Sequence, residues 1–195
     1  MQDYKEIIKN YIKDKKRLKH SISTGLYMQK NAKLFEIDEE KAYIAGLLHD
    51  IGKELSKEEI INLALDFEKR NIYEIKHFSF KKRHSFLLHG VASAEIMIRD
   101  LGITDTDILI ASICHTTGGI NLSLLAKYTF LSDFCEPLRD FKEAKIIHKY
   151  LVKEKNFNKA YFYTYNYVIR HLLKREVEIC VESIDGYNEA LRLLM

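Results

Sequence analysis

Histidine and aspartate residues recur within or beside apolar helical segments, and the pair His49-Asp50 is the clearest case. This pair lies in the apolar run from Ala45 to Lys53, where burying an imidazole and a carboxylate is costly unless each has a partner. A bound cation would satisfy both groups at once, because both are common metal ligands. Further candidate ligands in similar surroundings are His20, His89, His115 and Asp133.

Six candidate ligands are too many for one four-coordinate catalytic cation, which usually has three protein ligands and an open position. Two cations that share a carboxylate fit the number better, and Asp50 is the natural bridge because its two oxygens can reach both. Imidazoles and carboxylates favour Fe, Mn, Co, Ni or Zn over calcium. Such a pair would attract phosphate and acidify a bridging water, which as hydroxide could attack phosphorus.

The order of these residues, H, then HD, then H, H and D, resembles the ligand order of the HD-domain metal-dependent phosphohydrolases. More narrowly, several segments look like those of the YqeK-type symmetrical bis(5′-nucleosyl)-tetraphosphatases. The similarity runs from about Arg17 to Arg139 and is weaker beyond. The segments are GLLHDIGK at 46–53, LLHG at 87–90, HTTG at 115–118 and SDFCEPLR at 132–139.

The resemblance implies an iron-dependent enzyme that cleaves diadenosine tetraphosphate and related dinucleotides symmetrically into two nucleoside diphosphates. It also implies a homodimer. Carried over to this sequence, it implies two sets of metal ligands. One iron would be held by His20, His49, Asp50 and Asp133, and the other by Asp50, His89 and His115.

Outer residues of the same motifs are expected to face phosphate. Lys53 follows Asp50 by three residues and would share its helix face, so that an ammonium could neutralise a phosphoryl oxygen. The alternative is a solvated lysine favoured by the helix dipole. Catalytic roles are therefore predicted for Asp50 and Lys53. Further substrate contacts are predicted for Arg17, Thr116, Thr117, Gly118 and Arg139, the last having a surface ion pair with Asp140 or Glu136 as its alternative.

Two positions depart from the family pattern. Gly119 follows HTTG where these proteins often have arginine, and the stretch after LHG, at 91–94, contains no proline. An arginine can bind phosphate through two charge-assisted hydrogen bonds, so its replacement affects the expected substrate more than the expected metal site. Ser132 and Cys135 are conservative replacements that leave ligation unchanged.

Two other functions are compatible with the motifs. HD-type sites also suit a phosphatase of mononucleotides or guanosine polyphosphates, because such sites differ mainly in pocket shape. A non-catalytic nucleotide-binding module is the other possibility, although the presence of all six ligands argues against it.

The whole chain constrains the class of protein. Its 31 basic and 28 acidic residues are interspersed and give a net charge of +3 and a pI of about 8.6, which does not indicate a nucleic-acid partner. Three cysteines without CxxC spacing argue against a disulfide framework and for a reducing compartment. An apolar signal region at the N-terminus and a run of about 20 apolar residues are both missing, so we expect a cytoplasmic protein without a membrane partner.

Apolar residues recur at three- and four-residue intervals and breakers are few, with one proline and eight glycines, which predicts an all-α protein. We expect a single HD-domain helical bundle over 1–195, with a metal-site core at about 17–139 and a helical extension at about 140–195. Capping boxes are expected at Ser56/Glu59 and at Thr104/Asp107. Expected helices include Glu39 to Gly52, about Ser85 to Gly102, and Ser123 to Glu136, with two or three more after Arg139.

The polar segment 71–84 is expected to be a loop and could form a flap over the site. His84 lies five residues before His89, a spacing that points away on a helix, so it is interpreted as a loop residue. His77, His148 and His171 match no family segment and are interpreted as surface or packing residues. The tyrosine-rich stretch 161–167 is interpreted as core or dimer surface.

Overall fold

The computed structural model describes residues 3–72 and 85–195, which form helices and connecting turns with no β-strand among them. The predicted all-α class is confirmed. The α-helices are α1 (Tyr4–Tyr11), α2 (Lys15–Asn31), α3 (Glu39–Leu48), α4 (Lys57–Lys69), α5 (His89–Leu101), α6 (Thr106–Cys114), α7 (Leu124–Cys135), α8 (Lys142–His148), α9 (Phe157–Lys174) and α10 (Val181–Leu194). Short 3-10 helices η1 (Ala32–Phe35) and η2 (Ser85–Leu87) and a π-helix η3 (Lys149–Lys153) join them.

Local sequence signals place several helix ends correctly. Ser56 accepts the backbone N–H of Glu59 while the Glu59 carboxylate accepts the backbone N–H of Ser56, which confirms the predicted capping box of α4. Ser123 caps α7, and Glu136 ends it, as predicted. Three α-helices follow Arg139, in agreement with the two or three expected.

The capping box predicted at Thr104 and Asp107 is wrong. The N-cap of α6 is Asp105, whose carboxylate accepts the backbone N–H groups of Asp107 and Ile108. A carboxylate is a stronger acceptor than a hydroxyl, and its negative charge is favourable at a helix N-terminus. Lys41 of α3 binds the same carboxylate at 2.7 Å, so the cap also joins two helices.

The helix predicted over Glu39–Gly52 ends earlier, at Leu48, and residues 49–53 form turns. The backbone N–H of Gly52 donates to the Ser93 hydroxyl of α5 at 2.9 Å, which replaces a helical partner with a tertiary one. The helix expected from Ser85 begins as the 3-10 turn η2, and His89 is the first residue of α5. His49 and His89 therefore both lie at helix ends, where side chains can point along the helix axis toward a common centre.

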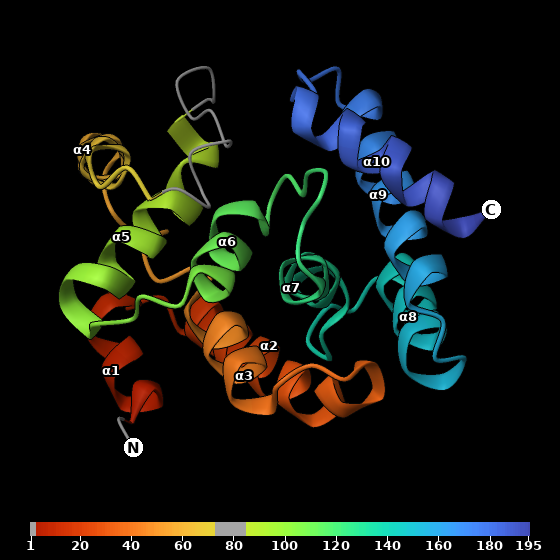
Figure 1. Cartoon of the computed structure of the whole chain (residues 1–195), viewed down its shortest axis with the longest axis horizontal. Helices are drawn as coiled ribbons and strands as arrows, with labels where there is room; N and C mark the ends of the chain where they lie inside the picture. Colours follow the sequence, from red (N-terminus) through yellow and green to blue (C-terminus); the bar gives the residue numbers. More distant parts are fainter. Residues whose placement is uncertain (1–2, 73–84) are drawn as a thin grey trace.

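The helices form a bundle in which α6 and α7 occupy the middle (Figure 1). Helices α1, α4 and α5 lie on one side of this pair, α2 and α3 run beneath it, and α8, α9 and α10 lie on the other side. The N-terminal helices α2 and α3 pack closely against each other and both contact α7. Segments that carry the candidate ligands are thus brought together from both sides of α6.

Close packing of α2 on α3 depends on glycine. A Cβ added to Gly46 would lie 2.6 Å from the sulfur of Met28 and 3.0 Å from the Cα atom of Gly25. The two helix backbones therefore meet without intervening side chains. This close crossing brings the start of α2, with His20, beside the turn that carries His49 and Asp50.

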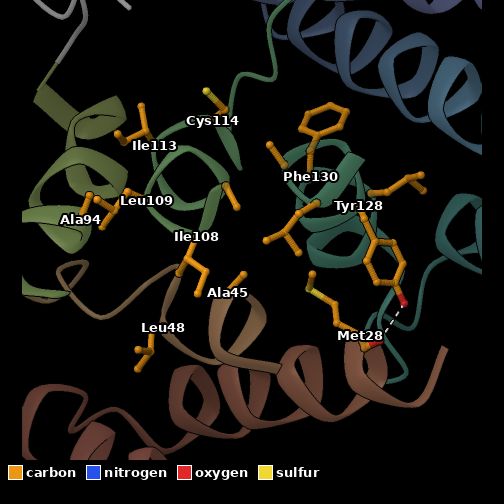
Figure 2. Close-up of a cluster of buried hydrophobic side chains, with 14 of the residues drawn as sticks. Met28, Ala45, Leu48, Ala94, Ile108, Leu109, Ile113, Cys114, Tyr128 and Phe130 are labelled. Carbon is orange, nitrogen blue, oxygen red and sulfur yellow. Dashed lines mark hydrogen bonds between the residues drawn. The ribbon is translucent and has the colours of Figure 1, made fainter. Parts of the chain in front are cut away.

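Side chains of α2, α3, α5, α6 and α7 fill the core shown in Figure 2. Tyr128 is fully buried there, and its hydroxyl donates to the backbone carbonyl of Met28 at 3.1 Å. Ile108, Leu109 and Phe130 belong to the same core and have little or no exposure. The buried hydroxyl of Tyr128 has its hydrogen-bond acceptor in the Met28 carbonyl near the end of α2. Helix α7 is therefore fixed to α2 by a polar as well as an apolar contact.

The C-terminal helices α9 and α10 pack against each other, and α9 also packs on α7. Tyr161 and Tyr165 of α9 are fully buried, which confirms that the tyrosine-rich stretch contributes to the core. The hydroxyl of Tyr165 accepts the backbone N–H of Gly119 at 2.9 Å, and Ser183 of α10 donates to the Thr117 carbonyl at 2.9 Å. The loop that follows α6 is therefore held by the C-terminal hairpin.

All three cysteines are free, with Cys114 and Cys135 buried and Cys180 partly buried. Among the described helices, none combines the length and apolar character that a bilayer crossing requires. His171 is exposed and His148 packs against Tyr27, as interpreted from the sequence. The predicted loop 71–84, apart from its first two residues, lies outside the described residues, and so do His77 and His84.

Candidate metal centre

Six side chains from five parts of the chain converge between α2, α5, α6 and α7. Their potential ligand atoms form three overlapping groups, and within each group the atoms lie within 4.8 Å of one another. The structure thus brings together all six residues that the sequence singles out. The groups are His20, His49 and Asp50; His49, His115 and Asp133; and Asp50, His89 and His115.

Asp50 lies between two sets of histidines. Its Oδ1 atom is 3.2 Å from the Nε2 atoms of both His89 and His115. Its Oδ2 atom is 3.7 Å from the Nε2 atom of His49. The two oxygens of one carboxylate therefore face different histidines, which is the arrangement that a bridging ligand requires.

Asp133 completes the other side of the cluster from α7. Its Oδ1 atom is 2.8 Å from the Nε2 atom of His20 and 3.6 Å from that of His49. His20, His49 and His115 each have a ligand atom within 4.8 Å of one in either Asp50 or Asp133, and His49 and His115 belong to groups with both, whereas His89 is grouped with Asp50 only. The cluster accordingly has two ends of different composition.

The second ring nitrogen of each histidine has its own acceptor. The Nδ1 atoms of His49, His89 and His115 lie 2.6–2.8 Å from the backbone carbonyls three residues earlier, those of Gly46, Phe86 and Ser112. Carbonyl oxygens only accept, so Nδ1 carries the proton and Nε2 presents a lone pair to the cluster. For His20 the acceptor is the Glu136 carboxylate, at 3.0 Å.

Two features of the cluster fit a cation. The Nε2 atom of His49 is buried and has no hydrogen-bond partner among the described residues. The Nε2 atoms of His89 and His115 face each other at 3.0 Å, although both carry lone pairs. A divalent cation would satisfy the first atom and remove the repulsion between the other two, so the donor set fits the metal that the pattern implies.

Electrostatics in the cluster favour ionised carboxylates. Although burial opposes it, the neighbouring imidazoles of His49, His115 and His89 hold the pKa of Asp50 well below its usual range. Burial lowers the pKa of His115 to about 4. Burial also acts to lower the pKa of His20, but its bonds to Asp133 and Glu136 raise that pKa to about 9.

Two cationic side chains lie on the ligand carboxylates. The Lys53 ammonium is 3.0 and 2.9 Å from the two oxygens of Asp50. The Arg139 guanidinium donates from Nη2 to Oδ1 of Asp133 at 2.7 Å and from Nε to the Asp133 carbonyl at 2.8 Å. Both side chains remain more than a third exposed, at 37% and 38%, so they border the cluster on its solvent side.

These contacts differ in part from the alternatives weighed on the sequence. Lys53 lies in a turn and not on a helix face, but it reaches Asp50 all the same. The principal partner of Arg139 is Asp133, with Glu136 at 3.9 Å, and Asp140 pairs with Lys145. Residue separation along the chain does not reveal these pairings, because α7 ends between the partners.

The remaining predicted substrate residues have different surroundings. The Thr116 hydroxyl lies 3.0 Å from Nε2 of His115 and 3.3 Å from that of His89, so it adjoins the cluster. Thr117 is buried and donates to the Gly118 carbonyl. Arg17 donates to the Lys53 carbonyl at 3.1 Å, which ties α2 to the turn after His49. Phosphate contacts by these residues stay a prediction.

Gly119, the departure from the family pattern, has a φ of 155°, a region that favours glycine. Its neighbour Gly118 has a φ of 65°, and a Cβ there would lie 1.8 Å from the hydroxyl of Tyr165. The backbone of this loop is therefore adapted to two glycines, and an arginine at 119 would be strained.

The sequence pattern does not reveal the role of Glu136, which from the sequence is only an alternative partner of Arg139. Glu136 is 1% exposed and accepts from His20, from the Ser23 hydroxyl and from the backbone N–H of Leu138. The signal that could have found it is a carboxylate immediately after the helix that bears Asp133. That signal is weak, because His20 lies 116 residues away in the chain.

The family described as HD domain matches residues 17–138 of this chain. A symmetrical bis(5′-nucleosyl)-tetraphosphatase of Halalkalibacterium halodurans is 31% identical over 175 residues, which cover 90% of this chain and 89% of that protein. A protein of the same name from Bacillus subtilis is 29% identical over 157 residues, or 80% of each chain.

A solved structure with a similar fold supports the same family. The crystal structure of a predicted HD superfamily hydrolase involved in NAD metabolism, from Clostridium acetobutylicum, gives a TM-score of 0.85 at 30% identity and covers 99% of each chain. With its ordered His, His-Asp, His, His and Asp residues gathered in one cluster, the chain belongs to the HD-domain hydrolases and, within them, to the family of symmetrical bis(5′-nucleosyl)-tetraphosphatases.

Proposed function

We propose that this protein hydrolyses dinucleoside tetraphosphates, with diadenosine tetraphosphate as the reference substrate, symmetrically into two nucleoside diphosphates. The observation that supports this most directly is the position of Asp50, whose two oxygens face different histidines at 3.2 and 3.7 Å. Relatives of nearly equal length carry the name of this activity. The proposal assigns the chemistry to a pair of cations held at this carboxylate.

One cation would be held by His20, His49, Asp50 and Asp133, and the other by Asp50, His89 and His115. Iron is the proposed metal, and manganese, cobalt, nickel or zinc would also suit imidazole and carboxylate ligands. When bound, the cations supply a water molecule of lowered pKa and neutralise charge on the phosphate. The side chains described below supply the rest.

Lys53 and Arg139 would bind the polyphosphate from the solvent side of the cluster. Each is partly exposed and already lies within 3.0 Å of a ligand carboxylate, so a phosphoryl oxygen at the cluster comes within reach of both. Thr116 would add a hydroxyl donor beside His115. Because a terminal phosphate has a second pKa of about 6, the leaving nucleoside diphosphate does not require a strong general acid.

Product analysis tests the proposal. Protein loaded with Fe²⁺ or Mn²⁺ is incubated with diadenosine tetraphosphate in water enriched in ¹⁸O. The nucleotide products are separated by chromatography, and their masses are measured by mass spectrometry. We expect ADP alone, with one heavy oxygen in half of it. AMP with ATP, or tight binding without turnover over hours, would contradict the proposal.

We also propose a homodimer and a cytoplasmic location. Three free cysteines suit a reducing compartment. Light scattering on the eluted protein is expected to give twice the mass of the 22.9 kDa chain. A monomer at micromolar concentration would contradict the first of these proposals.

A further inference from the structure

One of the four histidines in the cluster has a different second partner. His49, His89 and His115 donate from Nδ1 to neutral backbone carbonyls three residues earlier. His20 donates to the carboxylate of Glu136, from another part of the chain. A negatively charged acceptor makes the opposite ring nitrogen a stronger ligand than a neutral acceptor does.

The Glu136 side chain is buried, and three hydrogen bonds fix its position. It lies at the end of α7, where the backbone turns extended before Pro137, and its side chain is 1% exposed. One oxygen accepts from His20, and the other accepts from the Ser23 hydroxyl and the backbone N–H of Leu138. Ser23 lies three residues after His20, so α2 contributes two of the three groups that bind this carboxylate.

Glu136 also makes the charge of the cluster uneven. Asp50 is matched by Lys53, and Asp133 is matched by Arg139 at 2.7 Å. Glu136 is 3.9 Å from the same guanidinium, which is shared with Asp133, so one carboxylate at the His20 end has no lysine or arginine of its own among the described residues. Within residues 3–72 and 85–195, the Nδ1 atoms of His89 and His115 at the other end contact backbone carbonyls and no additional carboxylate.

From the partner of His20 and from this charge, we infer that Glu136 is a positioning residue that makes the two cation positions unequal. The position at His20, His49 and Asp133 binds a divalent cation more tightly and fills first. The position at His89 and His115 fills second. This inference rests on the proposed two-cation centre and adds an order of loading to it.

Titration of metal-free protein with Mn²⁺, followed by the electron paramagnetic resonance signal of free Mn²⁺, tests the inference. We expect wild-type protein to take up two ions in two separate steps. Glu136→Gln keeps an oxygen that can accept from His20 but removes the charge, and should weaken the tighter step roughly 10–100-fold while leaving the weaker step in place. Mössbauer spectra of ⁵⁷Fe-loaded protein should show two distinct sites in the wild type and an altered signal for one of them in the variant.

A second pair of variants assigns the steps. His89→Ala should retain one ion with the tight affinity of the wild type, and His89→Ala combined with Glu136→Gln should lose that affinity. Glu95→Gln is the matched control, because Glu95 is also a buried carboxylate, 3% exposed, but binds Arg70 and contacts no histidine of the cluster. It should lower stability without changing either uptake step.

Should Glu136→Gln fail to fold, Ser23→Ala removes one donor to the carboxylate and is expected to weaken the tight step by a smaller factor. Wild-type protein that takes up fewer than two ions overturns the two-cation centre and this inference together. Two ions taken up in the wild type with the same affinities in Glu136→Gln overturn the role of Glu136 alone, and the centre stands.

Discussion

The Nε2 atoms of His89 and His115 face each other at 3.0 Å, while each ring donates its Nδ1 proton to a backbone carbonyl. Neither nitrogen can then donate to the other, so two lone pairs are held in opposition by the fold. Asp50 lies 3.2 Å from both atoms. A bound cation would relax this geometry, so we expect the stability of the fold to depend on metal.

Metal removal should therefore lower thermal stability. One cation at 100 times its dissociation constant stabilises the folded state by about 2.7 kcal/mol, which raises the melting temperature of a chain of this size by about 5–10 °C. Differential scanning calorimetry of metal-loaded and chelator-treated protein measures this shift, and restoring Mn²⁺ should reverse it. Equal melting temperatures in all three samples would argue against a structural link to metal.

Asp50→Asn should abolish hydrolysis and lower metal content together. The amide is neutral and offers a single acceptor oxygen, so it cannot bridge two cations as a carboxylate does. Elemental analysis after desalting, on the same preparation that is assayed, measures both quantities. Full occupancy by two ions in this variant would exclude a bridging role for Asp50.

Lys53→Ala should reduce turnover without removing metal. Loss of a donor that stabilises transition-state charge commonly costs about 10²–10³-fold in kcat, and Lys53→Arg should recover part of it because the charge is retained. The matched control is Lys57→Ala, since Lys57 is exposed at the start of α4. Steady-state kinetics and metal analysis of the three variants decide the matter, and unchanged kcat in Lys53→Ala would leave the lysine with a structural role.

Tyr165→Phe should destabilise the loop that follows His115. The variant leaves the buried N–H of Gly119 without its acceptor, at a cost of about 1–3 kcal/mol. Urea unfolding should show this loss, and hydrogen exchange should become faster at residues 116–119. Tyr161→Phe is the control, because the Tyr161 hydroxyl bonds to Tyr165 and not to the loop. Equal effects of the two substitutions would contradict this account.

Stability should fall in mild acid through His148. Burial lowers the pKa of His148 from its ordinary value of about 6.5, because the neutral ring packs against α2 and lies 3.0 Å from the Tyr27 hydroxyl. The unfolded state then binds more protons, so the free energy of unfolding is largest above pH 6.5 and declines as pH falls toward the lower folded-state pKa. In chelator-treated protein, His148→Gln should reduce this decline; an unchanged pH profile would assign it to other groups.

The sequence predicts the helical class and the identity of the clustered residues because both depend on local or additive properties. Periodic apolar residues define helices, and a capping box such as Ser56 with Glu59 involves groups three residues apart. The six histidines and aspartates stand out for the same reason, since polar metal ligands in apolar runs can be recognised one segment at a time. Their ligation of two cations stays a prediction, and so does the division into a core and a C-terminal extension.

Only the tertiary structure decided which atoms meet. The early end of α3 follows from the bond between Gly52 and Ser93, and the pairing of Glu136 with His20 joins residues 116 positions apart. Such contacts depend on how helices cross, here on the close approach of α2 and α3 at Gly25 and Gly46, and helix periodicity contains no information about crossing. Residue types along the chain therefore indicated which chemistry is available, and packing determined the distances at which it can occur.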